Sequence, residues 1–177
     1  MLKKILIGLV VLAIILFGVF KYMQFNTKKY SPEVHKTYKV GDATVKLFYC
    51  SPSKNDREIF GNLVPYGEVW RTGANEPTTL ETDKPITLGN QSLPAGKYSL
   101  WTIPGKESWN VILNTKIPGW GIGFNGKAQR NPKGDIVNVT APVSGLPAIQ
   151  ENLRIDIDST LSFNWDNVRV AVPIGRL

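Results

Sequence analysis

The strongest pattern at the start of the chain is an unbroken apolar run that begins at Ile5 and ends at Phe20. Lys3 and Lys4 precede this run, and Lys21 follows it. As a helix that rises about 1.5 Å per residue, the run would be about 24 Å long, slightly shorter than the roughly 30 Å hydrocarbon core of a bilayer. Lysine side chains that reach toward the interface can close this gap. We therefore expect residues 1–25 to form a single transmembrane anchor, with the membrane as its partner.

A cleavable signal peptide shares the basic start and the apolar middle, and it is the alternative to an anchor. Signal cleavage needs small residues at the −3 and −1 positions, and residues 19–25 offer none. The run is also longer than a signal core of roughly 7–15 residues. Lysines on the two sides nearly balance, so the short N-terminal tail decides the orientation. We expect the N terminus in the cytoplasm and the following domain outside it, in the periplasm or at the cell surface.

Beyond the anchor, apolar and polar residues alternate with a period of two, which is typical of strands with one buried face. The alternation is clearest near the C-terminal end, where Leu153, Ile155 and Ile157 are separated by charged residues. It continues over 161–165 and 168–174, with a tight turn expected at 166–167. Further strands are predicted at 37–40, 43–50, 78–82, 86–88, 97–103, 109–113 and 136–141.

These short strands, separated by proline and glycine, predict an all-β fold, an antiparallel β-sandwich or barrel-like domain behind the single N-terminal helix. No segment after residue 30 shows convincing helical periodicity. We divide the chain into the anchor over 1–25, a polar tether over 26–34 and the β-sandwich domain over 35–177.

Charge and composition narrow the function classes. The chain has 21 Lys and Arg against 14 Asp and Glu, but residues 1–30 hold five lysines and no acid. The remainder is close to neutral, so its charge does not indicate that it binds nucleic acid. Because Cys50 is the one cysteine of the sequence, an internal disulfide is excluded. Because His35 is the one histidine, the sequence lacks the residues for a metal site with several histidines, and His35 next to the tether is a poor candidate for a histidine triad. We expect neither a metal nor a cofactor.

The densest polar and aromatic segment is the connection over 57–76, and long connections in compact β-domains are functional or packed on themselves. The guanidinium of Arg71 could hold a carboxylate or phosphate with two parallel hydrogen bonds. In the structural alternative, Arg71 pairs with Glu58, Glu68 or Glu76 and fixes the loop. The candidate ligand-binding residues in this segment are Arg57, Trp70, Arg71, Asn75 and Glu76.

A second candidate lies in the glycine-rich segment 119–126, where Trp120 and Phe124 could stack on a sugar or a peptide. The alternative is that these rings fill the core of the sandwich, which large aromatic residues do well. Asp156 and Asp158 share one face of a predicted strand and could bind a cation, although a solvated strand face explains them equally.

The string FGNLVPYGEVWRTGAN at 60–75 resembles a family of bacterial proteins that is described as a domain of unknown function, number 2911. The resemblance continues in LPAGKYSL at 93–100 and covers roughly residues 31–174. The resemblance implies an envelope or secreted β-domain. It implies no catalytic residues in this sequence.

The sequence therefore predicts a membrane-tethered, extracytoplasmic β-domain that acts as a non-catalytic binding or scaffolding module of the bacterial envelope. Its expected partners are an envelope glycan, a small anionic ligand or another protein. The alternative function is an envelope hydrolase that uses Glu68 or Glu76 as a general acid or base. A glycosidase-type pair could also include Glu81, with two carboxyl groups roughly 5–9.5 Å apart.

Overall fold

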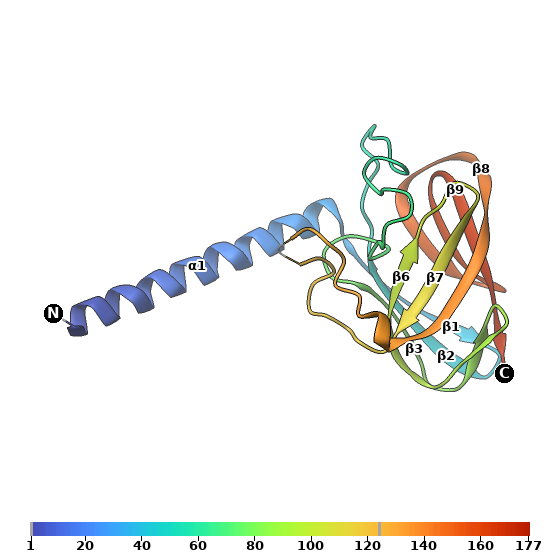
Figure 1. Cartoon of the computed structure of the whole chain (residues 1–177), viewed down its shortest axis with the longest axis horizontal. Coiled ribbons are helices and arrows are strands. Elements are labelled where there is room, and N and C mark those ends of the chain that lie inside the picture. The colour runs from blue at the N-terminus through green and yellow to red at the C-terminus, as the bar shows by residue number, and fades with distance from the viewer. Residues whose placement is uncertain (1, 124) are drawn as a thin grey trace.

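The computed structural model describes residues 2–123 and 125–177. Helix α1, Leu2–Tyr30, extends as a straight rod away from a β-domain (Figure 1). The apolar side chains of this rod are exposed. Within the described residues, α1 is the one helix that is long and apolar enough to cross a membrane, and a signal sequence passes the same test. The structure thus has one N-terminal apolar helix that fits either an anchor or a signal sequence.

Helix and β-domain are joined by two residues only. The segment 26–34, which we expected to form a polar tether, is helical up to Tyr30 and enters the first strand at Glu33. Pro32 cannot continue the helix because it lacks a backbone N–H and its ring clashes with the preceding turn. Lys28, in the last turn, forms ion pairs with Glu33 and with Glu76, the latter at 2.8 Å. The end of the helix is therefore tied to the surface of the domain.

In the part of the chain that the structure describes, the β-domain contains nine strands and one short 3₁₀ turn, η1. The strands pair antiparallel in the order β1-β2-β3-β6-β7-β8-β9-β4-β5, and the ends of this order do not meet, so the sheet is sandwich-like and not a closed barrel. The elements are β1 Glu33–Val40, β2 Ala43–Cys50, β3 Thr78–Thr82, β4 Ile86–Leu88, β5 Gln91–Leu93, β6 Gly96–Ile103, β7 Ser108–Asn114, η1 Pro132–Gly134, β8 Asp135–Ile157 and β9 Thr160–Arg176.

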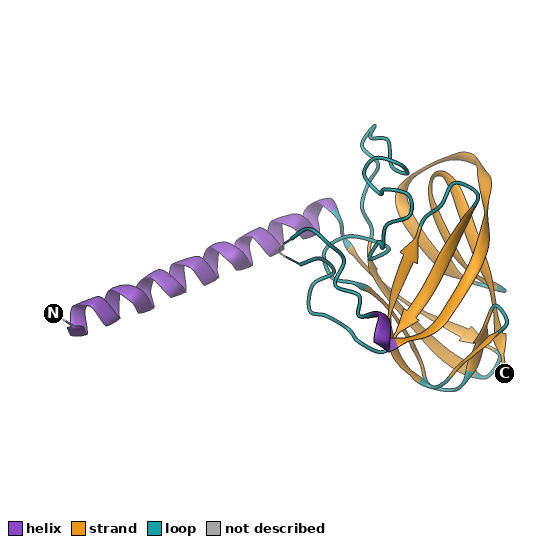
Figure 2. Ribbon diagram, in the orientation of Figure 1, coloured by secondary structure: helices purple, strands orange, loops and turns teal. Residues whose placement is uncertain are grey.

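The core follows the period-two pattern of the sequence. In β2, Val45, Leu47 and Tyr49 are buried, and they face the interior together with the alternating apolar residues of β8 and β9. Each such large apolar side chain contributes about 1.5–3 kcal/mol when it leaves water. The strands curve around this shared core, while the long loops gather at the end from which α1 departs (Figure 2).

The C-terminal strands differ from the prediction. We expected separate strands at 136–141 and 153–157 and a tight turn at 166–167, but β8 and β9 are two long continuous strands. Asp166 adopts a left-handed φ of 55° opposite Gln150, where the register of the β8–β9 pair shifts. The polar pair at 166–167 therefore marks a bulge-type irregularity inside a strand, and the predicted turn is wrong. The three-residue β5 was also missed, because so short a strand shows no alternation.

Candidate functional site

The loop between β2 and β3 is fixed to the sheet just before Arg71. The backbone N–H of Trp70 donates to the carbonyl of Thr102 in β6 at 2.7 Å, and the N–H of Thr102 donates back at 3.0 Å. The indole N–H of Trp70 donates to the carbonyl of Gly73 at 3.1 Å. These contacts hold Trp70 like a residue of an added strand, so the position of the next residue, Arg71, is set by the sheet.

The backbone after Arg71 is strained. Thr72 has a φ of 56°, which is a genuine outlier for a β-branched residue. Its hydroxyl lies 3.1 Å from the hydroxyl of Thr102, and its carbonyl accepts a hydrogen bond from the hydroxyl of Thr78 at 2.7 Å. Such conformations cost about 1–3 kcal/mol and persist where the surroundings fix them, often at ligand sites.

Arg71 itself carries a charge that no acidic side chain balances. Its Nε atom is buried and has no hydrogen-bond partner, and none of the carboxylates in the described residues forms an ion pair with it. The expected pairing with Glu58, Glu68 or Glu76 is therefore wrong. Burial, which disfavours the charged form, lowers the pKa of Arg71 from its ordinary value.

A second loop, between β7 and β8, packs over the first. The backbone N–H of Gly121 donates to the carbonyl of Asn75 at 3.0 Å, and the N–H of Gln129 donates to the carbonyl of Gly121 at 3.1 Å. Gly121 has no room for a side chain because the aliphatic part of Arg71 lies against it. The two loops therefore hold Arg71 between them.

Arg71 lines a cavity of about 460 Å³ at the junction of the helix and the domain. Trp70 and Trp165 form an aromatic wall, with parallel rings whose centroids lie 5.9 Å apart. Phe60 meets both rings edge-on. The volume falls within the range of about 300–1,000 Å³ that is usual for small-molecule sites. The other residues that matter for its chemistry are Arg57, Glu68, and Tyr30 and Ser31 at the end of α1.

The structure brings three of the six predicted ligand-binding residues to this cavity: Arg57, Trp70 and Arg71. Arg57 is exposed and donates from its Nε to the carbonyl of Lys54 at 2.9 Å. Trp120 is half-buried in the second loop and is not part of the lining. Phe124 lies outside the described residues.

Asn75 and Glu76 lie beside Cys50, outside the cavity lining. Asn75 is buried with a φ of 57°, and its side-chain nitrogen has no hydrogen-bond partner. A carboxylate oxygen of Glu76 lies 3.5 Å from the sulfur of Cys50, and the other pairs with Lys28. Burial, together with the negative charge of Glu76, raises the pKa of Cys50 to about 11. The thiol is therefore neutral and unreactive.

The carboxylates proposed for a hydrolase do not form a pair in the cavity of Arg71. Glu68 lines that cavity, whereas Glu76 and Glu81 line a separate groove of about 470 Å³ on the outer face of β1, β2 and β3. Both of the latter carboxylates have lysine partners, Lys28 for Glu76 and Lys46 for Glu81 at 3.6 Å. No specific contact favours acid–base chemistry here.

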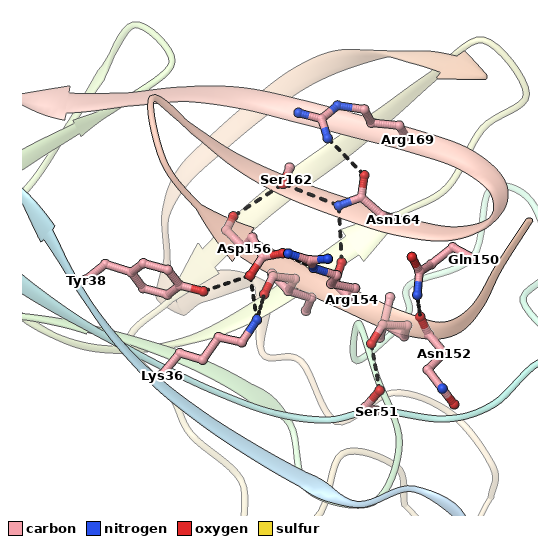
Figure 3. A network of polar contacts seen from close by, with 12 residues as sticks. Lys36, Tyr38, Ser51, Gln150, Asn152, Arg154, Asp156, Ser162, Asn164 and Arg169 are labelled. Atoms are coloured by element: carbon pink, nitrogen blue, oxygen red, sulfur yellow. Dashed lines mark hydrogen bonds and ion pairs between the residues drawn. The ribbon is translucent and has the colours of Figure 1, made fainter. Parts of the chain in front are cut away.

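Asp156 forms a polar network that the sequence did not reveal (Figure 3). Its carboxylate accepts hydrogen bonds from Lys36 at 2.5 Å, from the hydroxyl of Tyr38 at 3.0 Å and from Arg154. Burial alone would raise the pKa of Asp156, but these three donors outweigh it and the pKa is lowered. Asp158 instead accepts from the backbone N–H of Thr160 at 2.7 Å, so the two aspartates do not share one cation. Across residues 2–123 and 125–177, no cluster of three or more metal-ligating side chains is present.

The structure thus defines a class: a sandwich-like β-domain behind one N-terminal apolar helix, with an arginine-lined cavity at their junction. The chain belongs to the family described as "Protein of unknown function (DUF2911)", whose model matches residues 31–174. The family assignment made on the strings at 60–75 and 93–100 is therefore confirmed. Searches of curated proteins and of solved structures returned no significant match.

Several residues of the cavity could not be found by sequence reasoning. Trp165 follows the alternation of β9, and that pattern only predicts a core residue. Tyr30 and Ser31 belonged to the expected tether. Gly121 lies in a segment that was recognised as a glycine-rich loop, but nothing in the pattern links it to Arg71. The one signal that did point to the site was the length and polarity of the loop that carries Arg71.

Proposed function

We propose that this chain is a membrane-anchored binding module whose β-domain takes a small anionic ligand in the cavity of Arg71. The observation that carries the proposal is that the half-buried side chain of Arg71 lines a cavity of about 460 Å³, with a buried, unpartnered Nε and no carboxylate partner among the described residues. The family match and the fold are consistent with a binding role and do not specify one.

The physical reason is the cost of an uncompensated charge. Burying a charged group without a partner is expensive, so such a group is usually paired or loses its proton. Arginine keeps its charge at any physiological pH, because the ordinary pKa of its guanidinium lies far above that range. A carboxylate or phosphate that enters the cavity supplies the missing partner and can accept two parallel hydrogen bonds from the guanidinium.

The proposal places the domain outside the cytoplasm, with α1 retained as an uncleaved anchor. The absence of small residues at 19–25 supports retention of the helix. Protease added to intact spheroplasts should remove the domain and leave the helix. Digestion only after the membrane is permeabilised would contradict this orientation.

The binding itself is tested by titration of the full chain, in a non-ionic polyoxyethylene detergent, with acetate and with inorganic phosphate. We expect saturable heat release with at least one of them for the wild type, and at least about a tenfold loss of affinity for Arg71→Met. Arg176→Met is the matched control, because Arg176 is an exposed arginine at the end of β9. Equal affinities for all three proteins would contradict the proposal.

A further inference from the structure

The geometry points to an acidic sugar, a single saccharide unit that bears a carboxylate or phosphate, as the ligand of the Arg71 cavity. This inference rests on the proposed function and adds the part of the ligand that Arg71 does not touch. It starts from Trp70, which precedes Arg71 in the chain and lines the same cavity.

Trp70 offers the cavity an aromatic surface and no hydrogen bond. Its indole N–H is already used by the carbonyl of Gly73, and the indole N–H of Trp165 is used by the carbonyl of Glu151 at 3.0 Å. Trp165 is almost fully buried, whereas Trp70 is partly exposed and forms the accessible surface of the pair. The face of an indole carries partial negative charge and attracts the C–H groups on the apolar side of a sugar ring.

The rim supplies groups that suit hydroxyls. Ser31, between α1 and β1, and Asn55 and Glu68, in the loop between β2 and β3, line the cavity. A carboxylate such as Glu68 can only accept hydrogen bonds, and each sugar hydroxyl can donate one. Glu68 also offsets one of the two arginine charges, so the cavity carries a net positive charge of about one, which matches a ligand with one acidic group.

The position of the cavity relative to the membrane favours a sugar over a lipid headgroup. Ser31 and Tyr30 lie at its rim, ten residues beyond the end of the apolar run at Phe20. Ten helical residues span about 15 Å, whereas the headgroup layer of one leaflet is only about 5–7 Å thick. An upright helix therefore holds the cavity above the headgroups, within reach of envelope glycans and soluble sugars.

The test compares anions with and without a sugar ring, using the full chain in a polyoxyethylene detergent that contains neither sugar nor phosphate. The probes are acetate against glucuronate, phosphate against glucose 6-phosphate, and uncharged glucose. We expect each sugar acid to bind about tenfold more tightly than its ring-free anion, and glucose alone to bind weakly.

The contact with Trp70 is read from fluorine NMR of the chain labelled with 5-fluorotryptophan, with the Trp70 signal assigned from Trp70→Phe. Glucuronate should shift the Trp70 signal and leave that of Trp101, which is fully buried in β6, unchanged. The ligand response is read on the wild-type chain, and Trp70→Phe serves only to assign the signal.

The outcomes separate the two proposals. If acetate and phosphate bind through Arg71 but the sugar acids bind no more tightly, the acidic-sugar inference fails and the anion-binding function stands. If no anion binds at all, both fail. If binding appears only with vesicles that contain phosphatidylglycerol, the ligand is a lipid headgroup and the sugar inference is overturned.

Discussion

The side chain of Arg71 fills the space that a side chain at Gly121 would need. A Cβ atom on Gly121 would lie 2.2 Å from Cδ of Arg71 and 2.9 Å from its Cβ. These residues come from different loops, 50 positions apart in the chain. The contact therefore fixes the path of the Arg71 side chain from the β7–β8 loop. Only glycine at position 121 lets the two loops close over the guanidinium.

Gly121→Ala should displace Arg71 and weaken anion binding. Overpacking of this kind costs about 1–3 kcal/mol of stability, and the guanidinium can no longer lie where the cavity places it. Titration with the ligand used for the wild type measures the effect. Gly119→Ala is the control in the same loop, because no atom lies within 4 Å of its would-be Cβ. Equal affinity in both variants would show that Gly121 does not position Arg71.

Asp156→Asn should destabilise the domain by about 1–2 kcal/mol near neutral pH, because it removes an ionic partner of Lys36 and Arg154 at a partly solvated site. The folded-state pKa of Asp156 is lowered, so the unfolded chain binds this proton first as the pH falls. The stabilisation is thus complete above about pH 4 and is lost as the pH drops through the folded-state value.

The measurement is urea unfolding between pH 2.5 and 7 for the wild type and Asp156→Asn. The difference between them should shrink below about pH 4. Asp56→Asn serves as the control, since Asp56 is exposed and asparagine tolerates its positive φ of 56°. A difference that stays constant down to pH 2.5 would mean that the charge of Asp156 adds nothing to stability.

Cys50 should react with thiol reagents only when the protein unfolds. Its side chain is inaccessible, and a rise of the pKa from 9.0 to about 11 lowers the thiolate fraction about a hundredfold at neutral pH. A chromogenic disulfide reagent at pH 7.5, with and without urea, measures this. Rapid stoichiometric labelling of the folded protein would contradict the buried, neutral thiol.

Lys28→Ala should loosen the helix from the domain without unfolding either part. Lys28 joins the last turn of α1 to Glu33 and Glu76, and exposed ion pairs contribute about 0–1 kcal/mol. Global stability should therefore change little, while hydrogen exchange of the backbone at 30–34 should become faster. Lys29→Ala is the control, because the ammonium of Lys29 lies over Phe25 of the same helix. Similar hydrogen exchange in both variants would show that Lys28 does not hold the end of α1 to the domain.

The sequence predicted most of the sheet because burial on one face imposes a period of two. Strands β2, β3 and β4 have the predicted bounds. The predicted strands at 136–141 and 153–157 are parts of the one strand β8, and the pair at 166–167, predicted as a turn, lies within β9 where the register of the β8–β9 pair is irregular. The extent of these strands is decided by pairing with a partner strand, and no local sequence pattern encodes that pairing.

The candidate site was predictable only where one loop supplies it. Arg57, Trp70 and Arg71 lie in one segment and were found together, but Trp165 reaches the cavity from β9 and Tyr30 from the end of α1. The prediction of an ion pair for Arg71 was also wrong. The composition of a loop shows which charged residues are available, but it does not show which of them come into contact. Proximity across the fold is a tertiary property.

The most direct test of the central claim is the free energy of unfolding of the ligand-free full chain, wild type against Arg71→Met. Methionine keeps much of the aliphatic shape and removes the charge. If Arg71 is an uncompensated, partly buried cation held for a ligand, the variant should be within about 0.5 kcal/mol of the wild type or more stable. A loss of about 3–5 kcal/mol would show instead that Arg71 is one half of a structural ion pair, and the account of the cavity as an anion site would be wrong.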